Sequence, residues 1–439
     1  MALRDDTPGM VAYTNARLLD PASGLDAMGA VLTEGETIVE AGPGLFENGA
    51  PQNVENVDCG GACLSPGLVD IRMHTGEPGE EHKETLATAG RAAVAGGVTT
   101  MVCLPNTEPV IDDMSTVEFV ARRARKLGLA KVYCYGAITR GLEGKQITEM
   151  GMLAEAGAVA FTDGLQTLED AQVMARALAY AGTFGFLIVQ HAEEPSLTTD
   201  GVMNAGETAT RLGLSGIPSQ AEVIMVERDL RLVEMTGGRI HFAHVSTADT
   251  VDVIRRAKAR GLDVTCDTAP PYFALNELAV GDYRTFAKLA PPLRAESDRQ
   301  AIVAGLVDGT IDVIASDHLP QDEEAKRLPF TEAAFGGTGL ETLLPVTLEM
   351  VHNGHFELLD ALNLITHKPA SLLGLRAGRL EPGAPADLMI FDPGRGWKVT
   401  DEKLHSKSKN SPFDGRPVQG LVLRTVIDGR SVYEHAGAG

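Results

Sequence analysis

The central part of the chain alternates between short apolar segments and amphipathic segments, and this alternation constrains the fold more than any other feature. Eight apolar segments have the length and composition of buried strands, and helical patterns such as 84–95 and 220–235 separate them. Eight strand–helix repeats favour a closed parallel (β/α)₈ barrel, and a doubly wound open sheet is the alternative. The predicted strands are residues 64–74, 98–105, 131–138, 158–163, 184–191, 239–246, 262–268 and 311–317.

The two ends of the chain have a different pattern, in which short strands and turns follow one another without long helical segments. Such strands occur between residues 11 and 40 and again between residues 387 and 427. Two β segments that flank an α/β centre favour one small β-sandwich built from both chain termini. We therefore predict that residues 1–66 and 376–439 form this sandwich and that residues 67–375 form the barrel.

Polar residues that can bind a metal lie at the carboxyl ends of several predicted strands, where barrel enzymes hold their catalytic groups. A single histidine in such a place is often structural, but three histidines and two aspartates on five strands are difficult to explain by packing. A carboxylate at the end of an apolar strand also needs a partner or a metal ion. The residues at the strand ends are His74, Asn106, Asp163, His191, His244 and Asp317.

The chemistry of these groups indicates a metal-dependent hydrolase. Imidazole and carboxylate ligands together suit Zn²⁺ or another borderline divalent ion. Such an ion lowers the pKa of bound water, so that hydroxide forms near neutral pH. An aspartate beside the ion can accept the proton and later transfer it to a leaving nitrogen, which is the chemistry of amide hydrolysis. Cys59 and Cys63 are a weaker candidate for a metal pair, because no second pair follows them.

The overall composition excludes some functions and indicates a compartment. A net charge of −22 argues against nucleic acid or an anionic membrane as the main partner. The chain has no run of 18 apolar residues, so no membrane-spanning helix is expected. Five dispersed cysteines favour reduced thiols and therefore a cytoplasmic location.

Short motifs along most of the chain carry a family resemblance. They include Pro66-Gly67-Leu68-Val69-Asp70, Glu77-Pro78-Gly79, Leu104-Pro105-Asn106-Thr107, His244-Val245-Ser246, Pro291-Pro292-Leu293-Arg294, Ser316-Asp317-His318 and Ser408-Lys409-Asn410-Ser411-Pro412-Phe413. Together these motifs resemble those of the dihydroorotase family of the amidohydrolase superfamily. The resemblance implies a barrel with a binuclear zinc site that opens the dihydroorotate ring, reversibly, in pyrimidine synthesis.

The resemblance also implies a role for each residue at the strand ends. The metal ligands of the family match His74, Asp163, His191, His244 and Asp317, its general base matches Asp317, and its substrate-binding asparagine matches Asn106. Asp163, His191 and His244 could hold one zinc ion, with water as the fourth ligand. We therefore expect one zinc ion rather than two, and no metal at all is the other alternative.

Four positions depart from the family pattern. Arg72 stands in place of the first histidine of the His-x-His motif, and Gly76 stands in place of an arginine that binds the substrate carboxylate. Ala290 replaces an asparagine, and Gln321 replaces a histidine. Arginine binds a carboxylate as a two-pronged donor, which glycine cannot do. Dihydroorotate is therefore expected to be held poorly.

Arg72 is the departure with the largest electrostatic consequence. A fixed guanidinium and a divalent ion repel each other strongly within one small pocket. We therefore expect Arg72 to take the place of one metal ion and to pair with Asp163 or Asp317. The alternative is that Arg72 turns to solvent.

Two functions of different classes remain open. In the first, the chain is a dihydroorotase homologue with weakened or absent activity and serves as a structural partner of aspartate transcarbamoylase, since some relatives associate with that enzyme. In the second, it is an active mononuclear zinc hydrolase of a cyclic amide, of the dihydroorotase, hydantoin or allantoin type. The four departures favour the first function, and the surviving ligands keep the second open. A homodimer is expected in either case.

Overall fold

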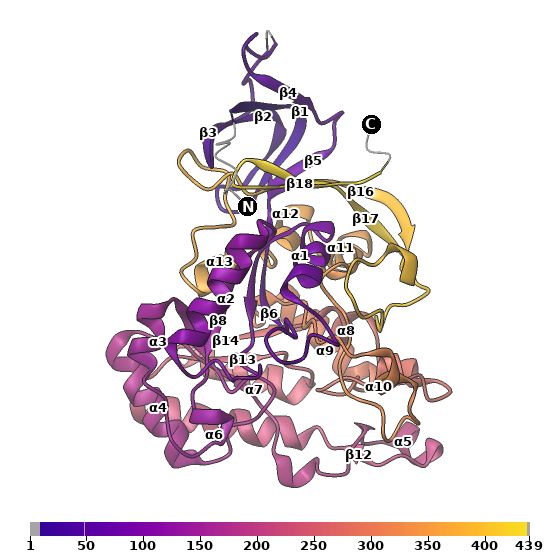
Figure 1. The fold of residues 1–439 in the computed structure, drawn as a ribbon. Helices are drawn as coiled ribbons and strands as arrows, with labels where there is room; N and C mark the ends of the chain where they lie inside the picture. The colour runs from indigo at the N-terminus through magenta and orange to yellow at the C-terminus, as the bar shows by residue number, and fades with distance from the viewer. Residues whose placement is uncertain (1–8, 48, 437–439) are drawn as a thin grey trace.

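The computed structural model describes residues 9–47 and 49–436, so residues 1–8, 48 and 437–439 of the predicted terminal segments lie outside it. Two eight-stranded sheets organise the described chain (Figure 1). One is parallel and surrounded by helices, and the other is built from strands of both chain ends. The sheet from the chain ends lies over one end of the helix-covered part (Figure 1).

The parallel sheet closes into a (β/α)₈ barrel. Its strands lie side by side in the order β6-β7-β8-β9-β10-β13-β14-β15, so each barrel strand is next to the one that follows it in the chain. The last and first strands meet where the backbone N–H of His74 donates to the carbonyl of His318 at 2.8 Å. The bounds are β6 (Leu68–Met73), β7 (Val98–Cys103), β8 (Lys131–Gly136), β9 (Ala158–Phe161), β10 (Ile188–His191), β13 (Ile240–Ala243), β14 (Val264–Thr268) and β15 (Val313–Ile314). All eight predicted strands are therefore present.

Helices follow the barrel strands and begin and end at residues that suit these positions. Asp113 caps the helix α2 by accepting a hydrogen bond from the N–H of Thr116 at 3.0 Å, and Gly128 ends it with φ +63°. The longer helices are α1 (Leu86–Ala95), α2 (Met114–Leu127), α4 (Ala171–Phe184), α6 (Gln220–Thr236), α7 (Ala248–Ala259), α9 (Glu296–Val307) and α11 (Leu343–His352). The shorter ones are α3 (Met150–Ala156), α5 (Glu207–Leu212), α8 (Pro270–Ala274), α10 (Glu323–Arg327), α12 (Leu358–Asn363) and α13 (His367–Leu372).

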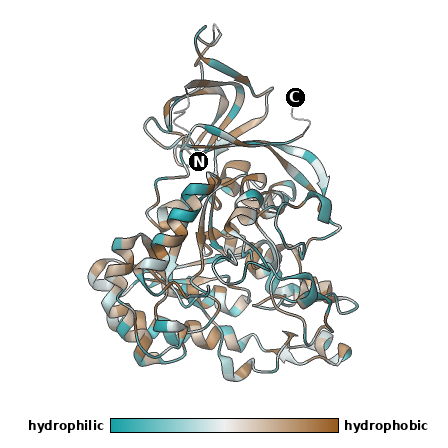
Figure 2. Cartoon of the chain, viewed as in Figure 1, coloured by the Kyte–Doolittle hydropathy of each residue, from teal (hydrophilic) through white to brown (hydrophobic). Residues whose placement is uncertain are grey.

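Two apolar cores hold the barrel together. The inner core takes side chains from successive strands, including Ile71, Val102, Ala160, Val189 and Val313, which fill the barrel interior. The outer core lies between the strands and the helices. Figure 2 shows this arrangement, with brown strands at the centre and more mixed colours on the surrounding helices. The barrel is therefore filled and rigid, and groups at its strand ends are held in fixed positions.

The second sheet joins the two ends of the chain. Its order is β18-β17-β16-β5-β1-β2-β3, with β4 paired to β1, so β5 and β16 connect the N-terminal and C-terminal strands. All eight strands belong to one hydrogen-bonded sheet around an apolar core of its own. The bounds are β1 (Met10–Asp20), β2 (Leu25–Glu34), β3 (Thr37–Gly42), β4 (Glu55–Asp58), β5 (Cys63–Pro66), β16 (Leu388–Lys398), β17 (Pro417–Ile427) and β18 (Arg430–Glu434).

Two predicted strands differ in extent from those observed. The segment 64–74 is two strands, because the chain leaves the terminal sheet at Pro66 and enters the barrel at Leu68. Gly67 lies between them, and a Cβ atom there would come within 2.1 Å of Cγ2 of Thr99, so only glycine fits this passage. The segment 184–191 begins too early, since α4 continues to Phe184 and the strand starts at Ile188.

Two further features concern the helices and the cysteines of the described chain. None of its described helices is both long and apolar enough to cross a membrane. All five cysteines are free thiols, and Cys103 and Cys134 lie with their sulfur atoms 3.5 Å apart on neighbouring strands without a disulfide. This arrangement matches the reduced thiols that their spacing predicts.

Candidate active site

Arg72 lies inside the barrel and is paired with a carboxylate. The side chain is 2% exposed, and its Nε donates to Oδ1 of Asp317 at 3.0 Å. Its Nη2 donates to the carbonyl of Gly164 at 3.4 Å, and Nη1 is buried without a hydrogen-bond partner among the described residues. The guanidinium therefore joins Asp317, on the neighbouring eighth strand, to the loop after the fourth strand, and the alternative of a solvent-facing Arg72 is wrong.

Asp317 also connects to the two histidines of the fifth and sixth strands. Its Oδ1 lies 3.2 Å from Nδ1 of His244, and Nε2 of His244 lies 2.7 Å from Nδ1 of His191. The two imidazole rings are tilted by 71° with centroids 4.9 Å apart. Arg72, Asp317, His244 and His191 thus form one continuous chain of polar contacts. The structure brings these four residues together, as the positions of their strand ends predict.

The backbone at two of these residues is strained, and a residue that was not predicted from the sequence supports one of them. His244 has φ +41° and Asp317 has φ +49°, which residues other than glycine seldom adopt. Oδ1 of Asp267 accepts a hydrogen bond from the N–H of His244 at 2.6 Å, and its Oδ2 contacts Nε2 of His241 at 2.9 Å. Asp267 therefore fixes the turn that aims His244 into the barrel.

The electrostatics of the chain make Asp317 a weak base. Burial alone would raise the pKa of Asp317, but His244 and Arg72 outweigh it and hold this pKa well below its ordinary value. Burial, His244 and Arg72 lower the pKa of His191 well below its ordinary value, so this imidazole is neutral. A general base works best with a pKa near the operating pH. Asp317 is therefore poorly matched to that role while Arg72 holds it.

His74 and Asn106, at the ends of the first and second strands, form a second set of contacts. Nε2 of His74 donates to the backbone carbonyl of Asn106 at 2.6 Å, and the N–H of Gly76 donates to Nδ1 of His74 at 3.2 Å. The side-chain amide of Asn106 donates to the carbonyl of Asp163 at 3.2 Å and accepts from the N–H of Leu165 at 3.1 Å. Both side chains are already satisfied by the backbone.

Asp163 is held by a residue that the sequence did not single out. Its Oδ1 accepts from the N–H of Thr139 at 2.9 Å, and its Oδ2 accepts from the Thr139 hydroxyl at 2.6 Å. Burial raises the pKa of Asp163, and the hydrogen bonds from Thr139 oppose this shift. The carboxylate is therefore directed at the loop after the third strand. No charge or periodicity marks Thr139 in the sequence, so nothing there could have identified it.

The predicted ligands do not fit a zinc ion in this arrangement. A zinc site needs three or four side-chain donors that point at one centre. Among residues 9–47 and 49–436, no group of three His, Cys, Asp or Glu side chains is placed to hold a metal. Both nitrogens of His74 are used, both oxygens of Asp163 are used, and the Arg72 cation lies against Asp317.

The positions that bind substrate in the family are also closed here. Gly76 has φ +67°, and a Cβ atom on it would come within 2.4 Å of the Glu84 carbonyl and 2.9 Å of the Glu80 carbonyl. An arginine therefore cannot stand at this position without movement of the backbone. Nε2 of Gln321 donates to the Phe335 carbonyl at 2.8 Å, so this amide is also committed to the fold. Ala290 has no side-chain polar group to offer.

Replacing Gly76 with alanine is expected to lower the free energy of unfolding by about 2–3 kcal/mol, because a left-handed backbone and a steric clash add together. Urea unfolding measures this change. Gly213 is the matched control, since it also has φ +67° and nothing lies within 4 Å of its added Cβ. Gly213→Ala should cost about 1 kcal/mol. If both variants lower the free energy of unfolding equally, the steric clash at the Gly76 Cβ position is contradicted.

Two cavities beside the chain of contacts from Arg72 to His191 differ in size and charge. The cavity that Asp317 lines has a volume of about 10 Å³, which holds roughly one water molecule. A larger cavity of about 570 Å³ reaches His191 from outside. Its charged lining residues are Glu143, Lys145, Glu169, Asp170 and Glu193. Four carboxylates and one ammonium oppose the entry of an anionic substrate such as dihydroorotate.

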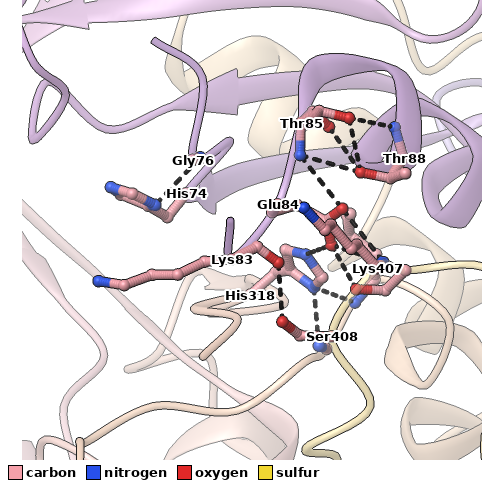
Figure 3. A network of polar contacts seen from close by, with 12 residues as sticks. His74, Gly76, Lys83, Glu84, Thr85, Thr88, His318, Lys407 and Ser408 are labelled. Carbon is pink, nitrogen blue, oxygen red and sulfur yellow. Dashed lines mark hydrogen bonds and ion pairs between the residues drawn. The ribbon is translucent and has the colours of Figure 1, made fainter. Parts of the chain in front are cut away.

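A C-terminal segment covers the loop after the first strand and binds a buried carboxylate, Glu84 (Figure 3). The hydroxyl of Ser406 donates to Glu84, and the N–H of Lys407 donates to both of its oxygens at 3.2 Å. Nε2 of His318 lies 3.5 Å from Glu84 on the other side. The Ser408 hydroxyl donates to the Lys83 carbonyl at 2.7 Å. We call residues 405–410 the strap, because they tie β16 and β17 to the barrel mouth.

Comparison with known proteins agrees with this fold and its motifs. Residues 61–250 match the family model described as "Dihydro-orotase-like". A dihydroorotase of Anaplasma phagocytophilum is 47% identical over 96% of this chain and 95% of its own length. A dihydroorotase of Syntrophotalea carbinolica is 45% identical over 96% of this chain and 99% of its own length. The L-hydantoinase of Arthrobacter aurescens superimposes with a TM-score of 0.85 and 26% identity, covering 97% of this chain and 96% of that one.

Proposed function

Because the chain belongs to the dihydroorotase family, we propose that it is a member whose barrel mouth is held by an ion pair in place of zinc. On this proposal it does not open the dihydroorotate ring at an enzymatic rate. Its fold and ancestry are those of an amidohydrolase of pyrimidine synthesis. Its contribution to that process is structural rather than catalytic.

The contact between Arg72 and Asp317 carries this proposal. The guanidinium lies 3.0 Å from the carboxylate that a ligand or general base would supply, and it is almost fully buried. A divalent ion near the same carboxylate would meet a fixed positive charge at short range in a medium of low dielectric constant. Arg72 therefore supplies the positive charge that keeps Asp317 ionised without a metal. The closed position at Gly76 and the acidic entrance support the same conclusion from the substrate side.

A structural role follows from what the chain has kept. It retains the complete barrel, the sheet from both ends and a rigid mouth, while positions for metal and substrate have changed together. We propose aspartate transcarbamoylase as the partner and a homodimer as the form of the chain itself, in the cytoplasm. Mixing the two purified proteins should give a complex of fixed stoichiometry by size-exclusion chromatography with light scattering. Independent elution at every ratio would refute this part of the proposal.

A second function remains a candidate because of one contact. Nδ1 of His191 and Nε2 of His244 converge to 2.7 Å, and Asp317 lies next to them. A single zinc ion that separated these nitrogens and displaced Arg72 would give a mononuclear hydrolase. Its substrate would be a neutral cyclic amide, such as a hydantoin or allantoin, because the entrance opposes anions.

The decisive measurement is zinc content together with ring-opening activity. Protein expressed and purified with zinc present is expected to hold well below one ion per chain. Its rate with dihydroorotate should be at least roughly 10³-fold below that of an active relative, since general acid–base catalysis alone supplies about 10²–10⁴. Dihydropyrimidine, hydantoin and allantoin rings should also remain closed. One tightly bound zinc ion with turnover of any of these rings would establish the second function instead.

A further inference from the structure

A cavity away from the barrel mouth has the properties of a ligand site. Its volume is about 480 Å³, within the range of small-molecule pockets, and it shares no lining residue with the cavities at His191 and Asp317. It lies where β16, β17 and β18 of the terminal sheet meet the start of the strap and α11 (Figure 1). Nothing in the proposed role of the barrel mouth uses this cavity.

Four basic side chains gather around the cavity, in a chain whose net charge is −22. They are Arg395, Lys403, His405 and His435. Arg395 and Lys403 are exposed, and neither has a carboxylate within ion-pair distance among the described residues. Nδ1 of His435 is buried without a hydrogen-bond partner in the same part of the chain. Two cations without an ion pair and one unpartnered imidazole nitrogen are therefore present at this cavity, and a bound anion would give the two cations a partner.

The basic groups are close enough to affect one another. Burial lowers the pKa of His435, and Arg395, Lys403 and His405 lower it further by repulsion. Arg395 and Lys403 therefore lie close enough to the His435 imidazole to disfavour its protonated form. Three carboxylates also line the cavity, those of Glu341, Glu402 and Glu434, and none of them pairs with Arg395 or Lys403 among the described residues. Glu341 accepts from the N–H and Nδ1 of His405 at 2.7 and 2.9 Å, and Glu434 pairs with Arg424 at 3.2 Å.

Aromatic side chains form another part of the lining. Trp397 is the only tryptophan in the chain, and its indole N–H donates to the Gly420 carbonyl at 3.1 Å, which fixes the ring. Tyr433 packs edge-to-face against His405 with ring centroids 5.8 Å apart. Both rings are half-buried, so each has a face or edge available to the cavity. Fixed rings beside unpaired cations are suited to a flat ring that carries a negative group.

We propose that this cavity binds a nucleoside phosphate. Its phosphate would be held by Arg395, Lys403 and His435, and its base would stack on Trp397 or Tyr433. The base adds affinity because every nucleobase has a flat face, and the phosphate adds affinity because it pairs with several cations at once. The cavity is separate from the barrel mouth, so this proposal does not depend on whether the chain hydrolyses a cyclic amide.

Tryptophan fluorescence gives a direct test, since Trp397 is the only reporter in the chain. Uridine monophosphate and adenosine monophosphate should quench this fluorescence to saturation. Uridine alone and inorganic phosphate alone should each bind at least tenfold more weakly than the monophosphates. The double variant Arg395→Gln/Lys403→Gln should bind the monophosphates at least tenfold more weakly, with an unchanged melting temperature.

The matched control is Lys126→Gln/Lys398→Gln, which removes the same charge from two exposed lysines outside the cavity. This control should bind the monophosphates as the original protein does. Tyr433→Leu, followed by calorimetry, should weaken nucleotide binding and leave phosphate binding unchanged. The proposal is overturned if neither monophosphate binds, if both double variants bind equally, or if inorganic phosphate binds as tightly as the nucleotides.

Discussion

Replacing Arg72 with methionine is expected to lower the free energy of unfolding by about 3–5 kcal/mol at neutral pH. The variant leaves Asp317, whose side chain is only 14% exposed, without a guanidinium partner and with the His244 imidazole 3.2 Å away. An uncompensated buried carboxylate costs more than the pair it replaces, because its desolvation is no longer offset. Urea unfolding followed by circular dichroism measures the difference.

The control removes both charges. Arg72→Met/Asp317→Leu should recover most of the lost stability, because replacing a buried ion pair with apolar groups is often neutral or stabilising. The exposed pair of Arg17 and Asp26 has the same residue types at 2.7 Å, and Arg17→Met should cost no more than about 1 kcal/mol. If Arg72→Met and Arg17→Met lower the free energy of unfolding by the same amount, the buried pair does not stabilise the barrel mouth.

The positions of the site residues could be predicted because they follow from strand periodicity. Arg72, His191, His244 and Asp317 lie at the ends of apolar segments, and closing those segments into a barrel brings the ends together. Asp267 is likewise a carboxylate at the end of an apolar strand, the seventh, so the same periodicity places it at the barrel mouth. The extent of individual strands was less predictable, because the break at Gly67 depends on its contact with Thr99.

The partners of the site residues could not be predicted from local sequence. Glu84 begins the predicted helical segment 84–95 and follows four polar residues, yet its side chain is fully buried. Its partner Ser406 is 322 positions away in the chain. Thr139 and Gly164 likewise act through contacts made only when separate loops meet. These hydrogen-bond partners decide whether a possible ligand atom is available to a metal. The sequence therefore predicts where the candidate ligands lie, but not whether their side chains point at one metal position.

Replacing Glu84 with methionine is expected to lower the free energy of unfolding by about 3–5 kcal/mol and to release the strap from the barrel. The hydroxyl of Ser406 and the N–H of Lys407 would lose their acceptor in a buried place, and each such loss costs about 1–3 kcal/mol. His318 would also lose the carboxylate 3.5 Å away. Urea unfolding should show the loss of stability, and a protease of broad specificity should cleave within residues 405–410 sooner than in the original protein.

Lys407→Met is the control, because its backbone N–H still reaches Glu84 and the change should stay within about 0.5 kcal/mol. The pH dependence is a further check. Burial would raise the pKa of Glu84, but His318 and Ser406 outweigh it and lower this pKa. Its contribution is therefore present above the ordinary glutamate pKa and lost as the pH falls through the depressed value. The difference in the free energy of unfolding between the original protein and Glu84→Met should become smaller in acid. A difference that does not depend on pH would contradict the assigned charge on Glu84.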